Sequence, residues 1–294
     1  MVNLTRPEGP GIELSRRMLG GVFFAGYAAF ALGADADPIH TDEEGLVTAI
    51  VQLPAADRVV PAYLARPDKR GRSPVVLVIS EVFGIHEYIR DICRRLAKAG
   101  YVALAPDFFV RHGDPAPLTD FDQIRKIVDA ATEAEVMGDI GAAIAWLGVQ
   151  PFADRKHMAV TGFCWGGAVV WLACETFSNF RCGVAWYGKL SRPKPGDFMG
   201  EPQRHWPLEL AASLKAPVLG LYGGQDQGIP MSDVDAMTTA LIAADKKGSD
   251  IIVYARSQHG FHADYRPSYD PIAAHDGWRR MLEFFAKNGV KPRA

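Results

Sequence analysis

The sequence has few cysteines, little net charge and no long apolar run. Four cysteines in 294 residues are too few for a disulfide scaffold in a chain of this length. The formal net charge of -2 gives no reason to expect nucleic acid or an anionic membrane as a partner. The charge-free apolar segment 20–33 is shorter than the roughly 20 residues of a membrane-spanning helix, so we expect no stable membrane anchor. The absence of repeats and low-complexity tracts excludes repeat architectures.

The composition is otherwise that of an ordinary globular protein, with 48% hydrophobic and 22% charged residues. The length allows one large domain or two ordinary ones. Because no internal linker is visible, we expect a single domain over residues 37–294. None of the eight histidines stands beside cysteine or carboxylate at metal-ligand spacing, so we expect no metal site and no cofactor.

Residues 1–36 have the pattern of an export leader. Arg16 and Arg17 precede the apolar segment 20–33, and residues 34–36 (Ala-Asp-Ala) offer a small-residue cleavage site. The paired arginines favour the twin-arginine route and therefore a periplasmic location. The alternative is an amphipathic N-terminal helix packed on the domain of a cytoplasmic protein.

Three of the cysteines have no evident chemical role. Cys93 lies in a helical pattern and is expected to be a small buried hydrophobe. Cys174 and Cys182 flank a short connection between a helix and a strand. We expect both to be core thiols, and a disulfide between them is the alternative if the protein is exported.

Short apolar runs alternate with helical patterns along the rest of the chain, which predicts an α/β fold with a mostly parallel twisted sheet and helices on both faces. The first two strands form an antiparallel pair at the sheet edge, and a loop or cap insertion covers 188–214. Strands are expected over 46–53, 60–65, 75–79, 101–104, 158–160, 183–186, 217–222 and 250–254. Helices are expected over 85–99, 120–147 with a break near Gly138, 168–173, 231–244 and 278–287.

One glycine-rich stretch carries the strongest functional signal, because it joins a strand to a helix through a cysteine. It reads Gly162-Phe163-Cys164-Trp165-Gly166-Gly167. The G-x-S-x-G pattern between a strand and a helix is the nucleophile elbow of α/β-hydrolases, and here cysteine replaces serine. The flanking glycines indicate a strained turn, so we expect Cys164 to be the nucleophile rather than a structural cysteine.

Two further side chains complete the order nucleophile, acid, histidine. Asp226 and His259 each directly follow a predicted strand, so both are expected at the same sheet edge as Cys164. His259 would take the thiol proton, and Asp226 would orient the imidazole. The alternatives are that Asp226 only forms a turn, and that His262 is the base.

The loop after the third predicted strand is expected to complete the site. Its sequence is Ser-Glu-Val-Phe-Gly over residues 80–84. Backbone N–H groups of Val82 and Trp165 are the expected oxyanion donors. Glu81 is unusual at the end of a buried strand and is either a site residue or a surface loop charge.

These motifs together resemble the dienelactone hydrolase family, the carboxymethylenebutenolidases. The resemblance runs from about residue 43 to 287, and it implies an α/β-hydrolase fold with Cys164, Asp226 and His259 as the triad. It also implies that Glu81 contacts the resting cysteine, moves as substrate binds and helps to generate the thiolate. The stretch 259–267 is similar to a branch of the family that carries leaders. The residues that carry the resemblance are Glu81–Gly84, Ala105–Asp107, Gly162–Gly167, Tyr187–Gly188, Asp226 and His259–Phe261.

The substrate pocket departs from the family pattern. Dienelactone-specific members hold the substrate carboxylate with two arginines, one of which matches Arg111. The other position is Ala263 here, and Arg266 is a nearby substitute with Asp264 beside it. Three aromatic residues are further candidates for lining the acyl pocket, with packing as the alternative: Tyr187, Trp165 and Phe261.

The function that these residues predict is hydrolysis of a small-molecule lactone or activated carboxylic ester through a thioacyl-enzyme. The alternative is a noncatalytic hydrolase-fold protein that binds a ligand or senses oxidants through Cys164. A peptidase or thioesterase activity on the same fold is a third hypothesis.

Overall fold

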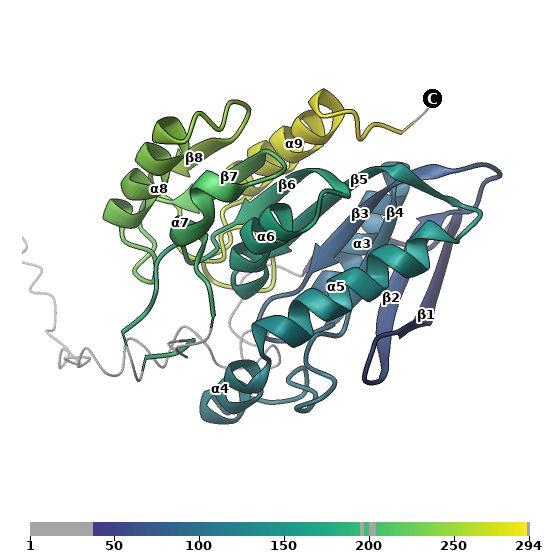
Figure 1. Cartoon of the computed structure of the whole chain (residues 1–294). Helices are drawn as coiled ribbons and strands as arrows, with labels where there is room; N and C mark the ends of the chain where they lie inside the picture. Colours follow the sequence, from purple (N-terminus) through teal and green to yellow (C-terminus); the bar gives the residue numbers. More distant parts are fainter. Residues whose placement is uncertain (1–37, 195–196, 200–203, 293–294) are drawn as a thin grey trace, which may run out of the picture.

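The computed structural model describes residues 38–194, 197–199 and 204–292. Its centre is one sheet of eight strands in the order β1-β2-β4-β3-β5-β6-β7-β8 (Figure 1). The predicted leader or N-terminal helix of residues 1–36 lies outside the described residues. The strands are β1 (Leu46–Pro54), β2 (Val59–Pro67), β3 (Ser73–Ile79), β4 (Val102–Pro106), β5 (Ala153–Phe163), β6 (Phe180–Trp186), β7 (Val218–Gly223) and β8 (Asp250–Tyr254).

The sheet is antiparallel only at one edge. β1 pairs with β2, and β2 pairs with β4, in antiparallel register, whereas all other pairs from β4 to β8 are parallel. Every residue of β3, β4 and β7 is buried, as expected for parallel strands covered on both faces. The predicted α/β-hydrolase fold, with its antiparallel edge pair, is confirmed.

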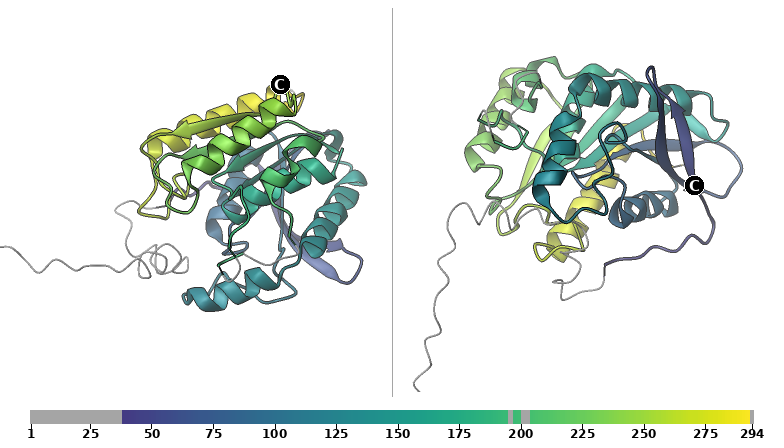
Figure 2. Two further views of the ribbon diagram at one scale, coloured as in Figure 1. Left: turned by 60° about the vertical axis from the view of Figure 1, so that its left-hand side comes forward. Right: turned by 90° about the horizontal axis from the view of Figure 1, so that it is seen from below.

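Helices cover both faces of the sheet (Figures 1 and 2). α5 and α6 pack on one face and α3 and α9 on the other, with α8 beside the edge strand β8. The helices are α3 (Glu87–Lys98), α4 (Phe121–Ala130), α5 (Glu133–Gly148), α6 (Trp165–Thr176), α7 (Pro207–Leu210), α8 (Met231–Ala243) and α9 (Pro271–Lys287), with a 3-10 turn at Ala211–Ser213.

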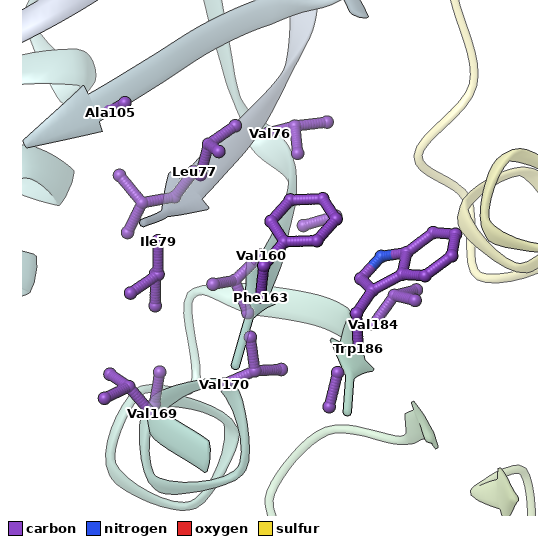
Figure 3. Close-up of a cluster of buried hydrophobic side chains, with 14 of the residues drawn as sticks. Val76, Leu77, Ile79, Ala105, Val160, Phe163, Val169, Val170, Val184 and Trp186 are labelled. Carbon is purple, nitrogen blue, oxygen red and sulfur yellow. The ribbon is translucent and has the colours of Figure 1, made fainter. Parts of the chain in front are cut away.

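The core beside α6 positions the functional end of the sheet. Figure 3 shows Val169 and Val170 of α6 beneath the strands, with Ile79 and Val160 above them. These four side chains are at most 4% exposed. Because the close-packed core fixes the start of α6 against β3 and β5, it also fixes the turn that joins β5 to α6.

The two largest differences from the predicted helix boundaries both come from helix caps. The break in the predicted helix 120–147 falls at Thr132, not near Gly138, because Thr132 and Glu135 form a capping box that starts α5. α9 begins at Pro271 rather than 278, since the Asp270 carboxylate caps it and proline suits a first helical turn.

The four cysteines are free thiols. A Cβ added to Gly183 would lie 2.6 Å from the Sγ of Cys174, so Gly183 faces α6. Its neighbour Cys182 therefore faces the opposite side of the sheet. The alternative of a Cys174–Cys182 disulfide is wrong because the sheet separates the two sulfurs.

Candidate active site

Cys164 occupies a strained turn between β5 and α6. Its φ angle is +55°, a left-handed region that a non-glycine residue adopts only when its surroundings enforce it. The Cys164 amide donates a hydrogen bond to the carbonyl of Trp186, at 3.0 Å. The residue is only 5% exposed, so the surrounding protein encloses most of the thiol.

The glycines around the turn are required by backbone contacts. A Cβ on Gly166 would lie 2.4 Å from the carbonyl oxygen of Ile79 and 2.5 Å from that of Ser80. A Cβ on Gly162 would lie 2.4 Å from the carbonyl oxygen of Gly166. The start of α6 thus lies directly against the end of β3, and brings Cys164 close to the loop that carries Glu81.

Asp226 and His259 are brought together from the ends of β7 and β8. His259 Nδ1 lies 2.7 Å from Asp226 Oδ2. The other carboxylate oxygen, Oδ1, accepts hydrogen bonds from the amides of Gly228 (2.8 Å) and Ile229 (3.2 Å). Asp226 therefore forms the turn and also binds the imidazole. Its interpretation as a turn residue does not exclude its interpretation as the acid that orients His259.

The surroundings of His259 favour the imidazolium form. Burial alone would lower the pKa of His259, but the charges of Asp226 and Cys164 outweigh it and raise the pKa to about 10. The ring of Tyr187, a residue with φ of +39°, packs edge-on against the imidazole at 5.2 Å between centroids. A protonated His259 beside Cys164 is the arrangement that stabilises a thiolate.

This pKa predicts a pH dependence of stability. A pKa raised from 6.5 to about 10 stabilises the folded protein fully below about pH 6.5, and this contribution falls with rising pH until it is lost above about 10. The Tm difference between wild type and His259→Gln should therefore shrink across this range. Asp226→Asn is the matched control, because it keeps the imidazole but removes the charge that holds its proton. A difference that grows with pH would contradict the assignment.

His262 has a different environment and is no candidate for the base. Its Nδ1 lies 2.7 Å from the hydroxyl of Tyr88, and its ring stacks on Trp278 with 5.8 Å between centroids. Burial, and then the charge of Arg95, lower the pKa of His262 well below its ordinary value. The ring is therefore a neutral core imidazole, and the structure favours His259 over His262.

Glu81 is completely buried, which excludes the reading as a surface charge. The hydroxyl of Tyr265 donates to its Oε2 at 2.6 Å, His86 Nε2 lies 3.3 Å from the same oxygen, and Arg266 Nη2 lies 3.5 Å from Oε1. Burial would raise the pKa of Glu81, but Arg266, His86 and Tyr265 outweigh it and lower the pKa to about 2. Glu81 is thus an ionised carboxylate in a buried cluster.

Tyr265 and His86 were missed by reasoning from sequence. Tyr265 also accepts a hydrogen bond from Arg266 Nε, at 3.2 Å. The position of Tyr265 beside Arg266, on the loop that carries His259, could have identified it as a candidate from the sequence. His86 gave no comparable signal, because its partner is identified only once the loop is folded.

Of the two expected oxyanion donors, Val82 lies on the loop after β3 and Trp165 begins α6, directly after Cys164. Val82 follows Glu81, is fully buried, and its amide donates to no backbone carbonyl in the described part of the chain. Trp165 is the first residue of α6, so its N–H has no partner within the helix. The Trp165 ring packs on Phe109, at 4.9 Å between centroids.

Arg111 is engaged elsewhere, which does not favour its predicted role as a substrate ligand. Its guanidinium binds Asp139 through Nη1 (2.7 Å) and Nη2 (2.9 Å), and Asp57 through Nε (2.8 Å) and Nη2 (2.6 Å). Two carboxylates therefore use both edges of the guanidinium. A third carboxylate from a substrate would have to displace one of them.

The aromatic candidates have packing partners. Phe261 is fully buried against Trp186, Tyr187 and Tyr254, an environment that favours its reading as a core residue. Tyr187, in contrast, packs against the imidazole of His259.

Within the described residues there is no grouping of three or more histidine, cysteine or carboxylate side chains that could hold a metal ion. In the same part of the chain, no helix combines the length and apolar character needed to cross a bilayer.

Comparisons with known proteins agree on one family. Residues 60–289 match the model of the dienelactone hydrolase family. A protein of Methylorubrum extorquens named "Putative carboxymethylenebutenolidase" is 47% identical over 253 residues, covering 86% of this chain and 85% of the relative. An Escherichia coli K12 protein of the same name is 41% identical over 269 residues, covering 91% and 97%.

A solved structure is also similar. The crystal structure titled as a putative dienelactone hydrolase from Klebsiella pneumoniae has 40% sequence identity and a TM-score of 0.77, and the match covers 82% of this chain and 99% of that one. With its fold, its family match and these relatives, the chain belongs to the dienelactone hydrolase family and is a carboxylic ester hydrolase.

Proposed function

We propose that this enzyme hydrolyses lactones or activated esters through a thioester on Cys164. The single observation that carries the proposal is the strained turn at Cys164 together with the His259–Asp226 pair from two neighbouring strand ends. A thiol nucleophile, a histidine and an acid that orients it are the components of covalent acyl transfer.

The steps follow from the charges of these groups. The thiol proton moves to His259, and the Cys164 sulfur then attacks the ester carbonyl to form a C–S bond and a tetrahedral oxyanion. When the C–O bond breaks, the imidazolium gives its proton to the departing oxygen. Acylation removes the negative charge of Cys164 that raises the His259 pKa, so the neutral imidazole can next activate the water that cleaves the thioester.

The oxyanion would be bound by the backbone amides of Val82 and Trp165. The Val82 amide donates to no backbone carbonyl among the described residues. The Trp165 amide has no partner within α6 and lies at the positive end of the α6 dipole. Loss of one such donor typically costs about 10²–10³-fold in kcat.

Glu81 would influence how readily Cys164 ionises. A bare carboxylate near the thiol disfavours the thiolate, whereas a carboxylate neutralised by a cation does not. Here Arg266 and Tyr265 bind Glu81. We infer that these contacts keep the Glu81 charge from opposing the thiolate.

The proposed substrate class is lactones and esters with good leaving groups, because a thiolate is itself a good leaving group. The relatives' name, carboxymethylenebutenolidase, supports a lactone. Specificity for a carboxylate-bearing dienelactone has less support, because Arg111 is bound by Asp57 and Asp139 and residue 263 is alanine.

The proposal is tested by trapping the intermediate. Wild-type enzyme is mixed with p-nitrophenyl acetate, quenched with acid within the first turnovers and digested for mass spectrometry. We expect acetyl groups on the peptide containing Cys164 and none on those containing Cys93, Cys174 or Cys182. Turnover without acetylated Cys164 would refute the thioester, and no turnover across esters and lactones would favour the noncatalytic alternative.

A further inference from the structure

The loop that carries His259 joins β8 to α9 and is buried over residues 260–266. Besides the contacts of Arg266 with Glu81 and Phe83 and the ring contacts of Tyr265, it contacts the loop and helix after β3 at three places. Two are the hydrogen bonds of Tyr265 to Glu81 (2.6 Å) and of Tyr88 with His262 (2.7 Å). The third is an ion pair between Asp264 and α3, and no catalytic step uses it.

This third contact is part of a relay of buried charges. Arg95 Nη2 binds Asp264 Oδ2 at 2.5 Å, and Arg95 Nε binds Asp91 Oδ2 at 2.5 Å. The side chains are 3% exposed for Asp264, 16% for Arg95 and 1% for Asp91. One planar guanidinium therefore binds two carboxylates from different elements, which fixes both distance and direction.

The other end of the relay is held by the chain segment around Thr41. The Thr41 amide donates to Asp91 Oδ1 at 2.5 Å, and its carbonyl accepts from Arg94 Nε at 2.7 Å. Asp91 is thus fixed from two sides. Any displacement of Arg95 would separate charges that are bound and shielded from water.

Stability alone does not explain such an arrangement. Burying an ion pair costs desolvation, and apolar residues of similar volume often give an equally stable protein. An apolar contact, however, does not fix the relative orientation of the groups that it joins, as paired hydrogen bonds do. Asp264 lies five residues after His259 on the same loop, and the Ala263 amide binds the Gly260 carbonyl at 2.8 Å, so the position of Asp264 is transmitted toward His259.

We propose that Arg95 and Asp264 are positioning residues for the hydrolysis: their ion pair fixes the loop carrying His259 to α3, and Asp91 with Thr41 holds Arg95 in place. The proposal rests on the proposed function, in which His259 transfers the protons. Misplacement of a catalytic group by about 1 Å can cost roughly 10²-fold in rate.

The test compares Tm with steady-state kinetics on p-nitrophenyl acetate. Arg95→Met leaves the buried Asp264 carboxylate unpaired, and Asp264→Leu leaves Arg95 Nη2 without its carboxylate although Nε still binds Asp91. Both variants should therefore lower Tm and kcat, Arg95→Met the more strongly in Tm. The double variant Arg95→Met/Asp264→Leu removes both charges, and its Tm should return toward wild type. We expect its kcat to stay about 10- to 100-fold low, with KM changed less than about threefold.

Leu147→Ala, a fully buried position on α5, is the control that lowers Tm without touching the His259 loop, and its kcat should equal wild type. Recovery of kcat together with Tm in the double variant would overturn the proposal. If the double variant does not fold, Arg95→Lys tests the proposal, because it keeps the positive charge but loses the planar guanidinium that binds two carboxylates at once. A reduced kcat with a Tm near that of wild type supports the proposal. An unchanged kcat refutes it. Either result leaves acetylation of wild-type Cys164 unaffected, so failure of the proposed function remains distinguishable.

Discussion

Replacing Cys164 with alanine should lower kcat/KM for p-nitrophenyl acetate by about 10⁴-fold or more. The variant keeps His259, Asp226 and the backbone amides but has no atom that can form the acyl bond. Residual hydrolysis would come from binding and oxyanion stabilisation alone. The measurement is the initial rate of nitrophenolate release, corrected for hydrolysis in buffer.

Cys174→Ala is the matched control for this prediction. Cys174 is also a buried free thiol and lies on the helix that Cys164 precedes. Burial raises the pKa of its thiol well above the ordinary value, so it has little thiolate character. Its loss should leave the rate within about twofold of wild type, since surface and small core changes away from a site have modest effects. Equal activity of Cys164→Ala and wild type would exclude the thioester mechanism.

Gly166→Ala should strongly destabilise the protein, because the elbow has no room for a methyl group at this position. The added Cβ would lie 2.4 Å from the Ile79 carbonyl oxygen and 2.5 Å from that of Ser80. Neither is the end of a flexible side chain, so the start of α6 must move away from β3. We expect a cost of about 3 kcal/mol or more in unfolding free energy, at the upper end of overpacking effects, together with loss of esterase activity.

Gly138→Ala is the same glycine-to-alanine substitution, but we expect it to raise the unfolding free energy rather than lower it. Gly138 lies within α5, and a Cβ there meets no atom within 4 Å. Alanine should therefore stabilise the helix by about 0.5–1 kcal/mol. Denaturant unfolding of both variants measures the difference. Similar stabilities for the two variants would show that the elbow tolerates a Cβ and that the turn is not as closely packed as described.

The sequence does contain local signals for the two helix starts that were predicted at the wrong residues. Thr132 and Glu135 have the spacing of a capping box, and Asp270 before Pro271 is a helix start. The prediction instead joined α4 and α5 across Thr132 and started the last helix only at residue 278. Both errors are local, and neither moves a functional residue.

The sequence by itself determined the strands, the elbow and the order of Cys164, Asp226 and His259. Apolar runs and glycine spacing are local properties, and strand ends in a parallel sheet share one edge whatever the side chains do. The tertiary structure decided which side chains meet. It paired His259 rather than His262 with Asp226, and it bound Arg111 to Asp57 and Asp139. The physical reason is that an ion pair or hydrogen bond depends on distance and burial, which segments far apart in sequence acquire only when they pack together.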